Sequence, residues 1–130
     1  IPTTCLYSMS RAPSDLYRAI RDGCGFISQT PDGPEVYMEC DGKILGQNVK
    51  YHPGLEMTIE VRRLRRGDVI KIITDWKVET ITCDADLKKI RWAEPLEEVL
   101  FYRTEVHRSY TDKYPYLPVM ISNPIYVGDR

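Results

Sequence analysis

Glu105 and His107 are the residues of this sequence whose types and spacing best fit metal chemistry. They stand two positions apart in an alternating apolar and polar segment, so an extended strand would present both side chains on one face. A carboxylate and an imidazole are common metal ligands, although a site usually collects more such groups in a convergent cluster. A small hydrolase that uses Glu105 and His107 is one hypothesis, and an exposed polar strand face is the ordinary alternative.

A second candidate site lies in the loop that follows, where three tyrosines gather before Pro118. Aromatic side chains in such a loop can stack on sugars or bases, although tyrosines more often pack over a sheet edge and keep their hydroxyl groups in water. We therefore consider a module that binds carbohydrate or protein, with Arg103 of the preceding segment as a further contact. The candidate binding residues are Tyr110, Tyr114, Tyr116 and Arg103.

Other patterns of catalytic residues are not found in the sequence, which has no glycine-rich phosphate loop and no GxSxG nucleophile motif. Residues 62–66, RRLRR, offer contacts to phosphate groups, but acidic residues flank them and the formal net charge of the chain is −1. A solvated connection between strands is therefore favoured. Nucleic acid and membranes are not expected partners, because the charge is nearly balanced and no apolar run approaches the roughly 20 residues that span a bilayer.

The cysteines are too widely spaced for a CxxC zinc motif. Two of them adjoin expected secondary structure and suit small buried apolar positions. A core built from 130 residues needs no disulfide framework, so we expect reduced cysteines and a cytoplasmic protein. The four cysteines are Cys5, Cys24, Cys40 and Cys83.

These candidate sites depend on a fold that the sequence predicts to be mainly β, with one helix near the N-terminus. Residues 13–22 favour the helix, because Pro13 suits its first turn and Gly23 suits its C-terminal end. Its apolar stripe would consist of Leu16, Ala19 and Ile20.

Short alternating segments then recur at roughly ten-residue spacing, which predicts an antiparallel, Ig-like β-sandwich of about seven or eight strands. Residues 55–61 alternate most regularly, residues 69–74 and 78–83 indicate a hairpin, and residues 93–98 indicate a loop. The stretch 99–127 organises the domain, and we expect its residues 122–127 to pair at a sheet edge. Its core-facing residues are predicted to be Leu100, Tyr102, Thr104 and Val106.

Two parts of the chain together resemble the CehA-like subgroup of PHP-type metal-dependent phosphoesterases. Residues 1–28 are similar to the family's segment that leads from the last metal-binding motif of the barrel into a β-rich tail, with matches at Thr4, Leu6, Tyr7, Pro13, Ala19, Ile20, Gly23 and the FIS of 26–28. Residues 101–128 are similar to the end of that tail, with matches at Tyr102, Arg103, Glu105, Val106 and the SNPIYV of 122–127. The middle of the chain matches only as a general strand pattern.

The resemblance implies that residues 1–24 connect an upstream barrel to a sandwich domain at 25–130. It also implies a divalent metal held by that barrel, whose HxH and Asp-x-His motifs are absent from these 130 residues. The chain begins with Ile1 rather than Met, which indicates a fragment or a processed product. We therefore expect a non-catalytic C-terminal accessory domain that packs on the barrel, covers it or mediates homo-oligomer contacts. The alternative is a stand-alone Ig-like module that binds carbohydrate or protein.

Overall fold

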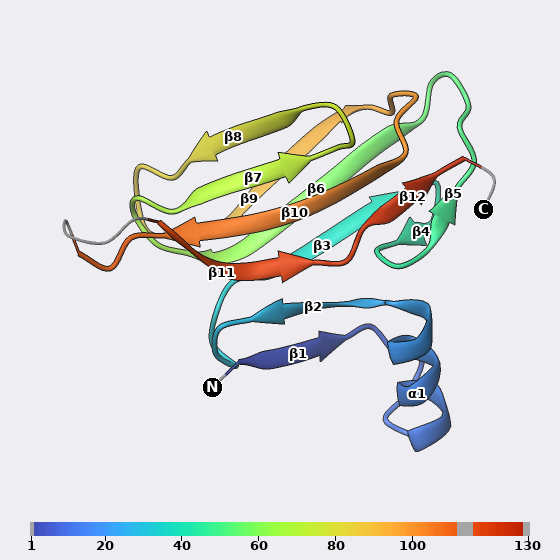
Figure 1. Ribbon diagram of the computed structural model, residues 1–130, viewed down its shortest axis with the longest axis horizontal. Coiled ribbons are helices and arrows are strands. Elements are labelled where there is room, and N and C mark those ends of the chain that lie inside the picture. Colours follow the sequence, from blue (N-terminus) through green and yellow to red (C-terminus); the bar gives the residue numbers. More distant parts are fainter. Residues whose placement is uncertain (1, 112–115, 129–130) are drawn as a thin grey trace.

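The computed structural model of the protein describes residues 2–111 and 116–128, and within them the chain forms one helix and two β-sheets (Figure 1). The sheets lie face to face, and one apolar core takes side chains from both. The pairing is antiparallel except between the two short strands at 48–49 and 125–127. The prediction of a mainly β, antiparallel sandwich with one N-terminal helix is confirmed.

The larger sheet has eight strands. They are β1 (Thr3–Leu6), β2 (Gly25–Ser28), β5 (Asn48–Val49), β7 (Val69–Ile73), β8 (Val78–Thr82), β10 (Phe101–Arg108), β11 (Leu117–Ser122) and β12 (Ile125–Val127). Their order is β1-β2-β11-β10-β12-β5, and the pair β7-β8 joins through β10. The smaller sheet has the order β4-β3-β6-β9, formed by β3 (Glu35–Cys40), β4 (Lys43–Ile44), β6 (Glu56–Leu64) and β9 (Leu87–Pro95).

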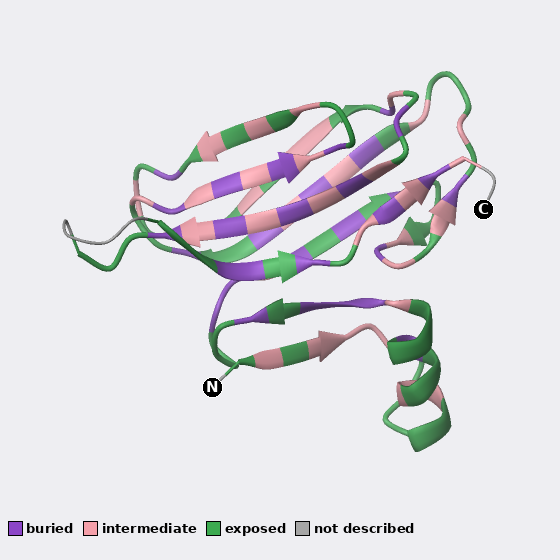
Figure 2. Ribbon diagram, in the orientation of Figure 1, coloured by how far each residue is buried: buried purple, intermediate pink, exposed green. Residues whose placement is uncertain are grey.

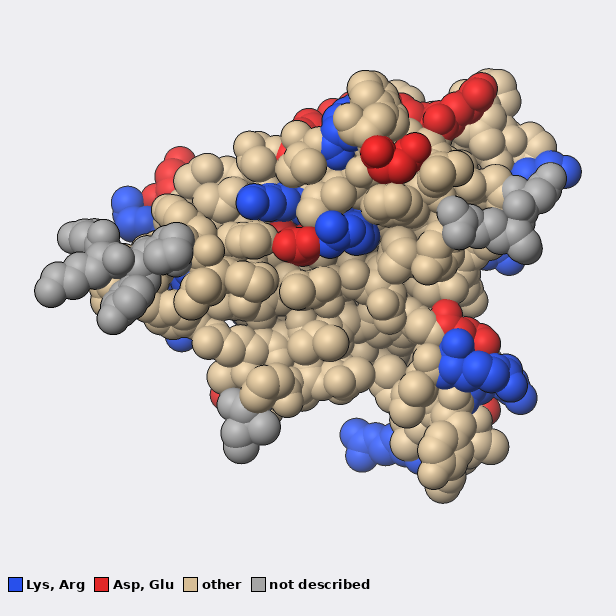
Figure 3. Space-filling view, in the orientation of Figure 1, with Lys and Arg blue, Asp and Glu red and all other residues tan. Residues whose placement is uncertain are grey.

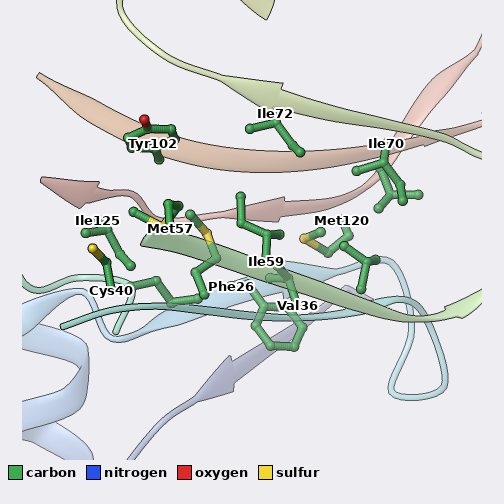
Figure 4. Close-up of a cluster of buried hydrophobic side chains, with 14 of the residues drawn as sticks. Phe26, Val36, Cys40, Met57, Ile59, Ile70, Ile72, Tyr102, Met120 and Ile125 are labelled. Atoms are coloured by element: carbon green, nitrogen blue, oxygen red, sulfur yellow. The ribbon is translucent and has the colours of Figure 1, made fainter. Parts of the chain in front are cut away.

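Strict two-residue alternation places the core side chains. In β6, Met57, Ile59 and Val61 are each at most 1% exposed, and the polar residues between them face outward. Side chains from the other sheet, including Ile70 and Ile72 of β7, meet them across the sandwich (Figure 4). Figure 2 shows the same alternation as bands of buried and less buried residues along the long strands.

Strand β10 follows the predicted parity with one exception. Tyr102, Thr104 and Val106 are buried as predicted, but Leu100 is 55% exposed. Leu100 precedes the strand, and its backbone N–H donates to Asp75 Oδ1 rather than to a neighbouring strand. The alternation therefore does not extend back to this residue, and Val99 takes the buried place instead.

Three other features of the strands differ from the sequence prediction. Strand β12 lies between β10 and β5, so residues 125–127 are not at a sheet edge. Strand β9 continues to Pro95, within the stretch predicted as a loop, because it pairs with β6 along its whole length and an edge strand tolerates proline. The described chain has twelve strands rather than seven or eight, since several have only two to four residues.

The helix α1 (Pro13–Asp22) has the predicted bounds. Pro13 stands at its first turn, and Gly23 ends it with a left-handed φ of 72°, a conformation that favours glycine. Asn123, which follows β11, donates from Nδ2 to the Gly23 carbonyl at 2.9 Å and ties the helix end to the sheet. Only Ala19 of the helix is buried, so α1 covers little of the molecule (Figure 2).

Candidate functional site

A polar row on the outer face of β10 contains the residues that the sequence suggested for metal chemistry. Arg103, Glu105 and His107 are all half-buried, and Lys71 of β7 stands opposite Glu105 in the sheet register. His107 Nε2 lies 2.8 Å from Glu105 Oε1, and the Arg103 guanidinium pairs with the other carboxylate oxygen. Figure 3 shows the resulting cluster of acidic and basic side chains near the centre of this face.

Within the row, Arg103 and His107 each bond to one oxygen of the Glu105 carboxylate. Burial opposes ionisation of Glu105, but the hydrogen bonds from Arg103 and His107 outweigh it and lower the pKa of the carboxyl. Both carboxylate oxygens are therefore engaged, and a cation in the row would compete with Arg103 and His107. Among the described residues, no group of three or more His, Cys, Asp or Glu side chains converges for a metal ion.

The tyrosine loop lies beyond the C-terminal end of β10. Tyr110 and Tyr116 are each 49% exposed, and the Tyr110 hydroxyl donates to Gln29 Oε1. Tyr114 lies outside the described residues. Arg103 is five strand residues before Arg108, a separation of about 16 Å along an extended strand, so it does not join Tyr110. The structure thus separates the predicted binding residues into two places.

An apolar surface that we call the helix-side patch consists of the exposed side chains of Ile20, Ile27 and Ile121. Their exposed fractions are 59%, 52% and 41%. Ile27 and Ile121 are cross-strand neighbours in β2 and β11, and all three line one shallow pocket with Leu6 of β1. Figure 3 shows a broad stretch free of charged side chains over this part of the sheet. The sequence indicated the apolar helix stripe but not the strand residues beside it.

A second concavity, the inter-sheet pocket, opens between the ends of the two sheets and has a volume of about 270 Å³. Trp92 of β9 and Tyr102 of β10 form its aromatic wall, with ring centroids 6.5 Å apart. Lys77 Nζ pairs with Glu97 Oε1 at 2.9 Å, and the Tyr102 hydroxyl accepts the Glu97 backbone N–H. Burial raises the pKa of Tyr102.

Sequence reasoning did not find the inter-sheet pocket, because its residues come from separate elements. Lys77 stands in a turn and Glu97 in a connection, and only the fold brings them to Trp92. Ile90 and Trp92 stand two positions apart in β9, and the strand parity that puts both on one face was the one available signal.

A buried ion pair links the turn after β6 to the end of β10. The Arg108 guanidinium donates to Asp68 Oδ1 at 2.8 Å and to Oδ2 at 2.9 Å. Asp68 is fully buried and Arg108 is 8% exposed. The hydrogen bonds to Asp68 raise the pKa of Arg108, and the Arg65 backbone N–H supplies a further donor to the carboxylate. The bidentate geometry gives this pair a structural role.

No helix among the described residues has the length and apolar character needed to cross a membrane. Comparison with family models, with curated proteins and with solved structures finds no match to this chain.

Proposed function

We propose that this chain is a non-catalytic C-terminal accessory domain of a PHP-like metal-dependent phosphoesterase, and that it packs on the catalytic barrel through the helix-side patch. The observation that carries the proposal is the place of this patch. Ile20 and Ile27 belong to the segment that resembles the family's connection from barrel to tail, and Ile121 lies beside Ile27.

The energetics of the patch favour a partner. Burying a fully exposed isoleucine side chain contributes about 1.5–3 kcal/mol, so each half-exposed residue of the patch offers roughly 1 kcal/mol to an interface. Clustered exposed apolar side chains mark interaction surfaces more often than single ones do. Ile20 also stands on a helix that buries only Ala19 within this chain, which leaves Ile20 of its apolar stripe exposed for an external contact.

In this proposal the hydrolytic chemistry belongs to the barrel. The barrel would hold the divalent metal with its own ligands, because the row of Arg103, Glu105 and His107 is internally paired and does not fit a ligand set. The accessory domain would cover the barrel rim or mediate contacts between subunits of a homo-oligomer. The four free cysteines support a reducing, cytoplasmic location within the same proposal.

The gene directly upstream of Ile1 supplies the first test. We expect it to encode a barrel with HxH and Asp-x-His motifs, the latter shortly before Ile1. A start codon or a signal peptide at that place would overturn the proposal.

A binding measurement between the separately expressed barrel and this chain supplies the second test. Ile27→Thr keeps a β-branched strand residue and removes apolar area, so it should weaken the complex. Val78→Thr, at an exposed position on β8 at the far edge of the sheet, is the matched control and should leave affinity unchanged. Equal affinity of the wild type and the Ile27→Thr variant would count against the patch.

A stand-alone Ig-like module that binds carbohydrate or protein is the second candidate. It is favoured by the exposure of Tyr110 and Tyr116 at the loop after β10. A glycan array and a pull-down with the variants Tyr110→Ala and Tyr116→Ala test it. Weaker binding by these variants would support the binding module. Binding equal to that of the wild type would exclude this loop as the binding site.

A further inference from the structure

Strand β8 ends the larger sheet with one of its two sides unpaired. Within the described residues it pairs only with β7, and Figure 1 shows it at the outer margin of the sheet, opposite β1. Every second side chain of the strand is exposed, beginning with Val78, which is 57% exposed. The open side of β8 is therefore accessible to another chain.

The backbone of every second residue of β8 points to that open side. Residues of an antiparallel pair alternate between those that exchange hydrogen bonds with the partner strand and those whose N–H and C=O groups point away. The Cys83 N–H donates to the Asp68 carbonyl at 2.8 Å, and the unbroken register continues this pattern along the strand. The odd-numbered residues of β8 therefore bond to β7, and no backbone bond among the described residues engages the even-numbered ones. The residues with open backbone groups are Val78, Thr80 and Thr82.

Strand β8 lacks most of the features that protect a sheet edge from a second chain. Edge strands are commonly shielded by proline, lysine, a bulge, an inward charge or short length. The sequence VETIT contains neither proline nor lysine, and its register with β7 has no bulge. Strand β9, at the edge of the smaller sheet, differs because it contains Lys89, Arg91 and Pro95. The one protective feature of β8 is the half-buried Glu79, which restricts the registers that a second strand can adopt.

We propose that a second copy of this chain pairs with the free edge of β8 in antiparallel orientation, with Thr80 opposite Thr80 of the other copy. This register places Val78 opposite Thr82, so the residues with open backbone groups all meet one another. The three pairs offer about six backbone hydrogen bonds. Each copy contributes the same residues, so the contact has the two-fold symmetry that is commonest among homodimers.

The position of Glu79 selects this register. With Thr80 opposite Thr80, Glu79 stands opposite Ile81 of the other copy, and no like charges are directly opposite. A shift that sets Val78 opposite Thr80 would place the two Glu79 carboxylates directly opposite each other, which destabilises strand pairing. A shift in the other direction would set Val78 opposite Asp84, beyond the end of the strand. Strand β8 is therefore complementary to a second copy of itself in one register.

This contact is separate from the proposed contact with the barrel. The helix-side patch belongs to α1, β2 and β11, whereas β8 lies at the other end of the sheet, so no residue is shared. Loss of β8 pairing therefore says nothing about barrel binding, and the two proposals fail separately.

Opposite charges at position 80 test the pairing directly. All proteins carry Ile20→Ser, which removes an apolar side chain of the helix-side patch and so reduces association through that patch. A contact between two five-residue strands belongs with small, weak interfaces, so sedimentation velocity covers about 10 μM to about 1 mM protein.

At a low salt concentration of about 50 mM, screening of the introduced charges is weak. Thr80→Lys alone and Thr80→Glu alone should each self-associate roughly fivefold more weakly than the Ile20→Ser parent, because like charges would then stand directly opposite. An equal mixture of the two variants should regain association, because opposite charges would face each other. Thr80→Val is the matched control, since it keeps a β-branched residue without a charge and should associate as the parent does.

An isotope-filtered nuclear Overhauser measurement tests the register. In a mixture of labelled and unlabelled protein, Glu79 Hα of one copy should give a signal with Ile81 Hα of the other. The Cα atoms of such a non-hydrogen-bonded pair lie about 4.5 Å apart. The same two residues within one copy are about 6.6 Å apart along the strand, and the filter removes their signal. Backbone amide spectra of all variants report whether each still folds.

Three results would overturn the proposal. The first is a parent protein that stays monomeric over the whole concentration range. The second is unchanged association of the folded Thr80→Lys and Thr80→Glu variants, which would place the contact elsewhere on the molecule. The third is a mixture of these two variants that associates no better than either variant alone.

Discussion

The two-sheet core and the helix α1 use apolar residues in opposite ways. From Met57 to Val61 of β6 every second side chain is almost completely buried, and those side chains belong to the same core as residues of the other sheet. Along α1, only Ala19 of ten residues is buried, and Ile20 remains 59% exposed. The alternate side chains of the strand are covered within this chain, whereas the apolar stripe of the helix is covered at Ala19, half-buried at Leu16 and exposed at Ile20. Stability and partner recognition should therefore respond to different substitutions.

The largest expected loss of stability follows removal of Arg108. The Arg108→Ala variant leaves the carboxylate of Asp68 buried and without its guanidinium partner, so the free energy of unfolding should fall by about 3–5 kcal/mol. Urea unfolding followed by tryptophan fluorescence measures it. Arg62→Ala is the control, because Arg62 pairs with Glu60 at an exposed position. This variant should lower the free energy of unfolding by less than about 1 kcal/mol. Similar losses in the two variants would contradict a structural role for burial of the pair.

The next largest effect separates the core from the outer face of the sheets. Ile59→Ala creates a cavity at a position that is 1% exposed, and the free energy of unfolding should fall by about 2–5 kcal/mol. Ile27→Ala, at a position that is 52% exposed, should lower the free energy of unfolding by about 1 kcal/mol or less. Thermal unfolding of the two variants beside the wild type measures the difference. If Ile27→Ala were as costly as Ile59→Ala, the helix-side patch would belong to the core.

A smaller, pH-dependent effect is expected from the polar row on β10. The hydrogen bonds from Arg103 and His107 hold the pKa of Glu105 below its ordinary value of 4.5, against the opposing effect of burial. Ionised Glu105 therefore stabilises the fold above the unfolded pKa, and this contribution disappears as the pH falls through the folded pKa.

The variant Glu105→Gln isolates that contribution. At neutral pH it should lower the free energy of unfolding by about 0.5–1 kcal/mol, and the difference from wild type should shrink as the pH drops below about 4.5. Urea unfolding across this pH range is the measurement. A difference that stays constant with pH would show that the ionised carboxylate does not stabilise the fold.

Local pattern was enough to predict the fold class and most of β10. The helix bounds followed from Pro13 and Gly23, and the buried positions Tyr102, Thr104 and Val106 followed from strand parity. The prediction that Leu100 faces the core was wrong because parity holds only while the chain stays extended. The chain before Phe101 turns, and the Leu100 backbone N–H donates to Asp75. A single sequence contains no sign of where that turn ends.

Long-range contacts were beyond the same reasoning. Asp68 and Arg108 are 40 residues apart, and each was an ordinary charged residue until β7 and β10 paired. The inter-sheet pocket needs Lys77, Trp92 and Glu97 to converge where the two sheets end side by side. Tyr110 is exposed as a binding loop requires, but strand length keeps it from Arg103. The pairing of strands that are distant along the chain could not be predicted from the sequence.

The smallest expected effect on stability is also the sharpest test of the contrast between core and helix. Isoleucine and serine have similar helix propensities, and Ile20 is mostly exposed, so Ile20→Ser should change the free energy of unfolding by less than about 0.5 kcal/mol. The same substitution should reduce self-association of the isolated chain, because it removes an apolar side chain from the helix-side patch. Sedimentation velocity over a range of protein concentrations measures the association.

Val78→Thr is again the control, since it removes a similar apolar group from an exposed position on β8. Substitution of a core residue should lower the free energy of unfolding and leave association unchanged. Substitution of a docking residue should reduce association and leave the free energy of unfolding unchanged. Stability loss in Ile20→Ser without any change in association would place Ile20 with the core, and α1 would then need no partner to explain its apolar face.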